Sequence, residues 1–203
     1  MSLETFIAFC AIELVLCVTP GPAVLFVVST AVARGSRAAL AGAFGIVAGN
    51  TFYFILSGIG VAAALLASHA LFTAIKWIGA AYLIYLGLHM LFAARGAAGE
   101  ARPAPASHAF ARGFAVQAAN PKALAFFVAL LPQFIDPAGA VGVQVLVLGV
   151  ASQIIEIGVL ALYAWLTMRA RALAGARFGE IVRRLAGGLL VAAGARLALV
   201  RSA

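Results

Sequence analysis

Apolar stretches of this sequence that are long enough to cross a bilayer contain charged residues far from their ends, among them Glu13, Lys122 and Glu156. An ionised side chain at the centre of a membrane helix costs at least ~2.5 to 3.5 kcal/mol, so such residues are usually paired or functional. A buried carboxyl group can take up and release a proton, and we expect Glu156 or Glu13 to do so. Lys122 would bind an anionic substrate group or neutralise a glutamate, and a purely structural ion pair with one glutamate is the alternative.

Two proline motifs interrupt the apolar stretches near these charges. Thr19-Pro-Gly-Pro22 lies in the first stretch, and Asn120-Pro-Lys122 lies in the fourth. Proline has no backbone N–H and clashes with the carbonyl one turn earlier, so each motif should split a helix and leave peptide groups unpaired. Irregular backbone survives at membrane depth only where protein covers it or where it lines a wet cavity. We therefore predict a binding site at these breaks, with a kink that only shapes packing as the alternative.

The predicted site would suit a molecule that carries both an ammonium and a carboxylate group, as an amino acid does. The half-helix that begins after Pro22 presents free backbone donors and a partial positive charge to a carboxylate, and the carbonyls near Thr19 accept from an ammonium. The candidate substrate-binding residues are Thr19, Pro20, Gly21, Pro22, Asn50, Tyr53, Asn120, Pro121 and Lys122.

The composition is that of an integral membrane protein. The 203 residues are 65% hydrophobic and 10% charged, and their mean hydropathy is +1.12, which excludes a soluble domain of this length. The net charge of +8 does not indicate nucleic-acid binding, because the basic residues fall mostly in short connections between apolar runs. The first apolar run is longer than a signal peptide and lacks a cleavage motif, so we expect it to be retained.

Six apolar runs predict an all-α fold with six transmembrane helices. They cover approximately residues 3–33, 38–67, 71–94, 113–133, 141–168 and 185–200. The connections after the first, third and fifth runs contain two, three and five Lys and Arg residues, and the two opposite turns contain none. This asymmetry places those three connections in the cytoplasm and both termini on the outer side. Five full spans, with one segment only dipping into the membrane, is the alternative.

The chain divides into two similar halves, residues 1–94 and 113–203, joined by a predicted cytoplasmic linker over residues 95–112. Pro20 aligns with Pro121 at an offset of 101 residues. Each half contains a broken helix, then a helix with polar groups, then an anchoring helix. Three spans carry the chain to the opposite side of the membrane, so the second half enters the membrane from the other side. We therefore predict two inverted three-helix repeats with helices 1 and 4 broken. We expect the two breaks to meet at mid-depth in the membrane.

Taken together, these motifs resemble the LysE/RhtB family of amino acid exporters, also called LysE-type translocators. The matching pieces are Thr19-Pro-Gly-Pro22, a stripe of small residues over 42–49, and the segments 76–87 and 113–134. We expect the small-residue stripe to let another helix approach closely. The resemblance implies export of amino acids or close derivatives across the bacterial inner membrane, driven by the proton gradient, by a protein that forms a homo-oligomer. Some members carry an acidic residue near Asn50, where this chain has a neutral amide.

Other function classes fit the sequence less well. An intramembrane enzyme needs a nucleophile with its base, or metal ligands, at one depth, but His69, His89 and His108 lie in different regions. A metal cation exporter is the alternative transporter, although Glu13, Glu156 and two cysteines are few ligands for it. A purely structural protein would not explain two matched breaks. The sequence predicts no enzyme, cofactor or metal site, and it does not identify the exported amino acid.

Overall fold

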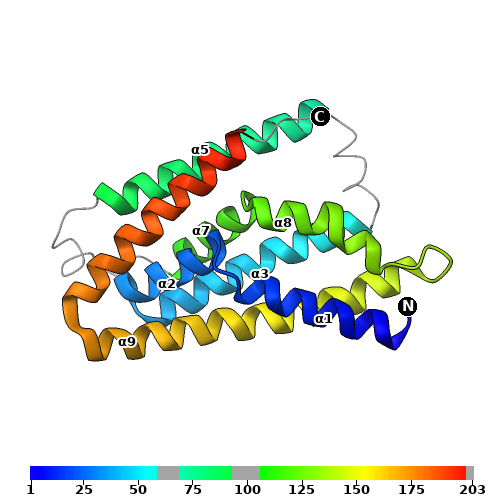
Figure 1. Cartoon of the computed structure of the whole chain (residues 1–203), viewed down its shortest axis with the longest axis horizontal. Coiled ribbons are helices and arrows are strands. Elements are labelled where there is room, and N and C mark those ends of the chain that lie inside the picture. Colours follow the sequence, from blue (N-terminus) through cyan, green and yellow to red (C-terminus); the bar gives the residue numbers. More distant parts are fainter. Residues whose placement is uncertain (59–68, 93–105, 200–203) are drawn as a thin grey trace.

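The computed structural model describes residues 1–58, 69–92 and 106–199, and these ranges are helical with no β-strand. In this part of the chain the all-α prediction is confirmed (Figure 1). The helices are α1 (Leu3–Val18), α2 (Pro22–Arg34), α3 (Ser36–Gly58), α5 (His69–Phe92), α7 (Ala106–Ala118), α8 (Pro121–Ala125), the π-helix η1 (Phe126–Leu130), the 3₁₀-helix η2 (Leu131–Phe134) and α9 (Val141–Leu199).

The first apolar run is broken where the prolines predict. Helix α1 ends at Val18, α2 begins at Pro22, and the two helices are bent by 49°. Pro22 occupies the first turn of α2, where its missing N–H has no cost, and Gly21 is the N-cap. The hydroxyl of Thr19 donates to the Val15 carbonyl at 2.7 Å and so closes the end of α1.

The fourth apolar run is broken in a second way. Helix α7 ends at Ala118 and α8 begins at Pro121, with the side chain of Asn120 accepting from the Lys122 backbone N–H as the N-cap. The helix then widens into the π-helix η1 and tightens into η2, which ends at Phe134. Single π-helical turns are rare and are frequent at functional sites.

Helix α7 begins at Ala106, inside the predicted linker over residues 95–112, and the division of the chain into two repeats stays a prediction. Alanine is the best helix former, and Ala109 is buried in the structure, so packing extends the helix beyond the long apolar run. Residues 95–105 of the linker, residues 59–67 of the second predicted span and residues 200–203 lie outside the described residues.

The predicted basic connection between the fifth and sixth spans is helical and not a loop, because α9 continues throughout Val141–Leu199. Arginine, alanine and leucine are strong helix formers, and Arg184 pairs with Glu180 one turn earlier at 2.6 Å. Figure 1 shows that α9 nevertheless changes direction beyond its yellow part, so that its red end runs alongside α5. The two predicted spans therefore form one bent helix. We call residues 141–168 its first arm and residues 185–199 its last arm.

The described helices include several candidate membrane spans. Ser36–Gly58 and Val141–Leu173 are each long and apolar enough to cross a bilayer, and the bent pair α1 and α2 qualifies as a third span. Many large apolar side chains on these helices are exposed, as expected for surfaces that face lipid. The chain is therefore membrane-embedded, and the six-span arrangement stays a prediction.

Small residues allow α3 and α7 to touch backbone to backbone. A Cβ atom added at Gly45 would lie 2.0 Å from the Phe110 carbonyl oxygen, and one added at Gly113 would lie 2.1 Å from the Gly42 carbonyl oxygen. This confirms the expected role of the small-residue stripe over 42–49. The same kind of contact joins α5 to the last arm of α9, where a Cβ at Gly87 would lie 2.6 Å from the Gly187 carbonyl oxygen.

We expect Gly113→Ala to destabilise the protein, because the added methyl group meets backbone atoms that cannot move aside. Overpacking of this kind costs about 1–3 kcal/mol or more. Thermal unfolding of the purified protein in detergent measures the loss. Gly158→Ala on α9 is the matched control, since a Cβ there meets nothing within 4 Å, and it should keep or raise the unfolding temperature. Equal unfolding temperatures for the two variants would contradict the close helix crossing.

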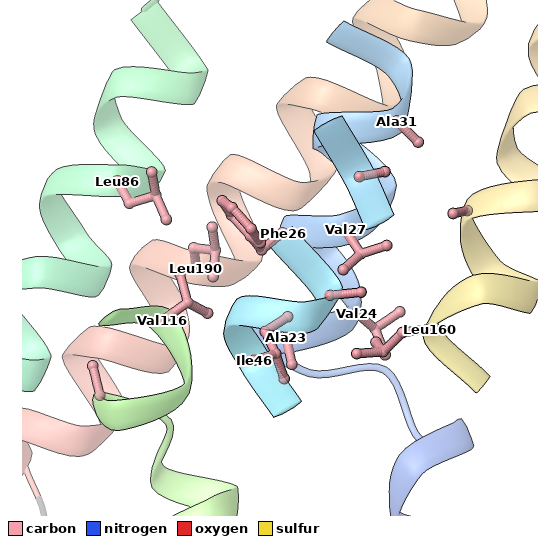
Figure 2. Close-up of a cluster of buried hydrophobic side chains, with 14 of the residues drawn as sticks. Ala23, Val24, Phe26, Val27, Ala31, Ile46, Leu86, Val116, Leu160 and Leu190 are labelled. Atoms are coloured by element: carbon pink, nitrogen blue, oxygen red, sulfur yellow. The ribbon is translucent and has the colours of Figure 1, made fainter. Parts of the chain in front are cut away.

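The central apolar core surrounds α2. Phe26 and Val27 of α2 are buried together with Ile46 of α3, Leu160 of α9 and other apolar side chains. In Figure 2, Phe26 extends toward Leu190 on the last arm of α9, whereas Val24 lies against Leu160 on its first arm. This packing fixes α2, and hence the first break, between both arms of α9.

Candidate functional site

The two helix breaks contact each other through Lys122. Its ammonium group donates to the carbonyl oxygens of Leu16 at 2.6 Å and Thr19 at 3.2 Å. These carbonyls belong to the end of α1, where backbone acceptors have no partner within the helix. This contact shows that the two breaks meet, and their position at mid-depth in the membrane stays a prediction. The predicted alternative of an ion pair is wrong, because in the described part of the chain Lys122 bonds to carbonyls and to no glutamate.

Two tyrosines satisfy further carbonyls at the breaks. The hydroxyl of Tyr163 on α9 donates to the Val18 carbonyl at 2.7 Å, and the hydroxyl of Tyr53 on α3 donates to the Ala118 carbonyl at 2.7 Å. Each tyrosine therefore covers the broken helix of the other half of the chain. Backbone groups freed by the prolines thus receive side-chain donors, as burial away from water requires.

We expect Tyr163→Phe and Tyr53→Phe each to lower the free energy of unfolding by about 1 kcal/mol, because each removes one donor from a carbonyl at a break. Thermal unfolding in detergent measures the change. Tyr85→Phe on α5 removes the hydroxyl of an exposed side chain and serves as the control. If the control loses as much stability as the other two, the tyrosines do not support the breaks.

Glu13 is buried in the contact between α1 and α9. Only 4% of its surface is exposed, and its carboxylate accepts from the Ser152 hydroxyl at 2.5 Å and from the Cys17 thiol at 3.8 Å. Ser152 and Glu156 are one turn apart on α9, so both glutamates lie on the same side of this helix. The two predicted proton carriers therefore belong to one site.

Glu156 ends a chain of side-chain amides. The Asn50 amide donates to the Glu156 carboxylate, and Gln117 donates to the Asn50 oxygen at 2.5 Å. Asn120 in turn donates to the Gln117 oxygen at 3.0 Å. Asn50, Gln117, Asn120 and Glu156 are each at most 6% exposed. The chain connects α9, α3 and α7 to the second break.

A cavity of about 40 Å³, lined by both charged and apolar side chains, lies between the breaks. It has room for a few water molecules. Its lining residues come from α1, α2, α3, α7, α8, η1 and α9, and they are Glu13, Leu16, Cys17, Ala23, Val24, Asn50, Gln117, Asn120, Lys122, Ala123, Phe126, Glu156 and Leu160.

The structure divides the predicted site residues into two groups. The residues that line the cavity are Asn50, Asn120, Lys122, Glu13 and Glu156. The residues that do not line it but form the breaks or support them are Thr19, Pro20, Gly21, Pro22, Tyr53 and Pro121. Both groups therefore belong to one region, although only the first reaches the cavity directly.

Sequence reasoning missed Gln117, which joins Asn50 to Asn120 in the cavity. A signal was present, because Gln117 and Asn120 form a polar pair three residues apart in an apolar run. Ser152 and Tyr163 were also missed as site residues, and their contacts join parts of the chain that are distant in sequence. Among the described residues, no group of three or more His, Cys, Asp or Glu side chains is placed to hold a metal ion.

Comparison with known proteins finds one matching family model and several related membrane and efflux proteins. The family model for LysE type translocators matches residues 14–201. The chain is 32% identical to a homoserine/homoserine lactone efflux protein of Salmonella typhimurium, over 100% of both chains. It is 33% identical to a leucine efflux protein of Salmonella choleraesuis, over 68% of this chain and 66% of the relative. An uncharacterised membrane protein of Pseudomonas aeruginosa is 35% identical over 88% of each chain. No solved structure gives a significant match.

Proposed function

Because this chain belongs to the LysE type translocator family, we propose that it exports amino acids or close derivatives across the bacterial inner membrane by proton antiport. The observation that carries this proposal is the cavity where two broken helices meet, whose lining includes two glutamates and a lysine. The relatives named as homoserine and leucine efflux proteins support the class of substrate. Transporters commonly bind substrate between discontinuous helices of this kind.

In the proposed substrate complex, the ammonium group binds at the end of α1. The carbonyls of Leu16 and Thr19 already hold one ammonium group, that of Lys122, at hydrogen-bond distance. A substrate ammonium would replace it there. The displaced Lys122 would then face the carboxylates of the cavity or the carboxylate of the substrate.

The substrate carboxylate would bind at the start of α2. Its N-cap residue is Gly21, which provides no side-chain hydrogen bond, and Ala23 and Val24 line the cavity. The first backbone N–H groups of a helix are free donors at the positive end of its dipole. The corresponding end of α8 is closed by the Asn120 side chain, so α2 offers the more open anion site.

We assign the coupling proton to Glu156, with Glu13 as the second candidate. Both carboxylates are buried and line the cavity. Glu13 is held by Ser152 and Cys17, whereas Glu156 connects through amides to the second break. A change in the charge of Glu156 therefore has a direct structural route to the site of Lys122.

The proposed architecture is two inverted three-helix repeats, with six spans and both termini on the outer side. The reciprocal contacts of Tyr53 and Tyr163 with the opposite breaks support this symmetry. Inverted repeats allow one half to rock against the other around a fixed site. Assembly into a homo-oligomer remains a prediction from the family resemblance.

Transport in proteoliposomes tests the proposal. Vesicles containing the purified protein are loaded with radiolabelled homoserine, leucine or another amino acid, and release is timed with and without an imposed proton gradient. We expect the gradient to accelerate release of at least one amino acid and a proton uncoupler to remove that acceleration. Release no faster than from protein-free vesicles for the whole panel would contradict the proposal.

A further inference from the structure

Gln117 is the central member of the amide chain between Glu156 and the second break. It donates to Asn50 at 2.5 Å and accepts from Asn120 at 3.0 Å, and Asn50 donates to Glu156. At the far end, the Asn120 oxygen accepts from the backbone N–H of Lys122 at 3.1 Å. One continuous series of hydrogen bonds therefore runs from the first turn of α8 to a buried carboxylate on α9.

In this series of hydrogen bonds, each donor faces the next residue in the direction of Glu156. A side-chain amide has its donors on nitrogen and its acceptor on oxygen, so reversing one member requires its neighbours to reverse as well. The last donor needs an oxygen of Glu156 that can accept, which the ionised carboxylate provides best. A proton on Glu156 weakens that acceptor, and because hydrogen bonds in a buried network polarise one another, the change extends to the neighbouring amides.

The other end of this series of amides holds the start of a helical segment. Asn120 supplies the N-cap of α8, which continues directly into η1. Such caps contribute about 0.5–2 kcal/mol, so loss of the Asn120 cap weakens the first turn of α8. Lys122, whose backbone N–H binds this cap, also joins the two breaks through its ammonium group. A shift of Asn120 therefore moves the residue that holds the breaks together.

We propose that Gln117 is a positioning residue that couples protonation of Glu156 to the start of α8. Protonation weakens the hydrogen bond that Asn50 donates to Glu156, Gln117 and Asn120 shift with Asn50, and the N-cap of α8 loosens. Lys122 then leaves the carbonyls of α1, which frees them for a substrate ammonium. This inference rests on the proposed proton-coupled export and assigns the route of the coupling.

The other groups around Glu156 do not provide an equivalent connection. The titratable and charged groups that share its cavity are Glu13 and Cys17 of α1 and Lys122 of α8. From α2 the cavity receives only the apolar Ala23 and Val24. The charges of Glu13 and Lys122 act on Glu156 through space, whereas among the described residues the amides of Asn50, Gln117 and Asn120 form a hydrogen-bonded path to α8.

Hydrogen–deuterium exchange tests the coupling without any substrate. The full-length protein in lipid nanodiscs is compared at two pH values chosen, from the infrared carboxyl band that Glu156→Gln removes, to lie on either side of Glu156 protonation. Exchange of a peptide covering residues 119–126 is corrected for the intrinsic pH dependence. We expect the wild type to lose protection when Glu156 is protonated, and Gln117→Met and Glu156→Gln to lose this pH-dependent difference.

Gln144→Met is the matched control. Gln144 is also a buried glutamine with two hydrogen bonds, to the backbone N–H and carbonyl of Asp136 at 2.9 Å each, but it lies outside the cavity. This variant should keep the wild-type pH response at residues 119–126. Gln117→Glu preserves the shape of the side chain and, when protonated, its donor, so it should restore the response if Gln117→Met folds poorly.

Two results would overturn the inference: a wild-type pH response in Gln117→Met, or no response in the wild type. Because this measurement uses no amino acid, it is separable from the transport test. A protein that shows the coupled exchange but transports no amino acid would refute the proposed substrate class alone. Amino acid transport with an unchanged response in Gln117→Met would refute Gln117 alone.

Discussion

Glu156→Gln should abolish proton-driven export while leaving the protein folded. Glutamine has the shape of glutamate and keeps an oxygen that can accept from Asn50, so the amide chain can persist. Glutamine cannot bind and release a proton at this position, so an imposed proton gradient can no longer drive transport. In proteoliposomes, we expect gradient-driven amino acid release to fall to the level of protein-free vesicles. Exchange of internal for external substrate, which needs no net proton movement, should continue.

Two further carboxylate variants are the controls for Glu156→Gln. Glu13→Gln changes the other buried glutamate, which Ser152 and Cys17 hold, and should retain a response to the gradient. Glu4→Gln changes an exposed carboxylate in the first turn of α1 and should transport as the wild type does. If gradient-driven release persists in Glu156→Gln and disappears in Glu13→Gln, then Glu13 and not Glu156 carries the coupling proton.

The positions of the breaks could be predicted from the sequence because proline acts through local sterics. Pro20, Pro22 and Pro121 each lack a donor and cannot sit inside a regular helix, whatever surrounds them. The glycines over 42–49 predicted a close helix contact for a similar reason, since only small residues let backbones touch. The charged residues were identifiable because burying charge in a membrane is costly.

The partners of these residues could not be predicted in the same way. Lys122 was expected to meet a carboxylate, but it binds the carbonyls of Leu16 and Thr19, because the end of α1 offers unpaired acceptors at that point. Gln117 gained its role only when α3 and α7 packed closely enough to bring it to Asn50. Such contacts depend on tertiary packing, which a periodic pattern does not specify.

The boundaries of helices were also set by packing rather than by hydropathy. The basic residues after Met168 predicted a connection, and they do mark where α9 changes direction. Arginine is nevertheless a good helix former, so charge alone does not interrupt a helix as proline does. The start of α7 at Ala106 has the same explanation. The length of an apolar run reflects the thickness of the membrane that it crosses, whereas a helix can continue beyond the membrane.

Lys122→Met should remove transport and destabilise the protein together. The substitution takes away the only donor described for the Leu16 carbonyl outside its helix and one donor for Thr19. The part-buried carbonyl of Leu16, left without this donor, costs about 1–3 kcal/mol. It also removes the positive charge that faces Glu13 and Glu156 in the cavity. We expect a lower unfolding temperature in detergent and loss of both gradient-driven release and substrate exchange in proteoliposomes.

Arg171→Met separates the two effects of the lysine substitution. Arg171 on α9 donates to the Val32 carbonyl at 2.6 Å near the end of α2, so it is also a cation that satisfies a helix-terminal carbonyl. It lies outside the cavity. Its removal should lower the unfolding temperature but leave substrate exchange intact. If Lys122→Met retains exchange at the rate of Arg171→Met, then Lys122 only holds the helices together, and the ammonium site at the end of α1 must be abandoned.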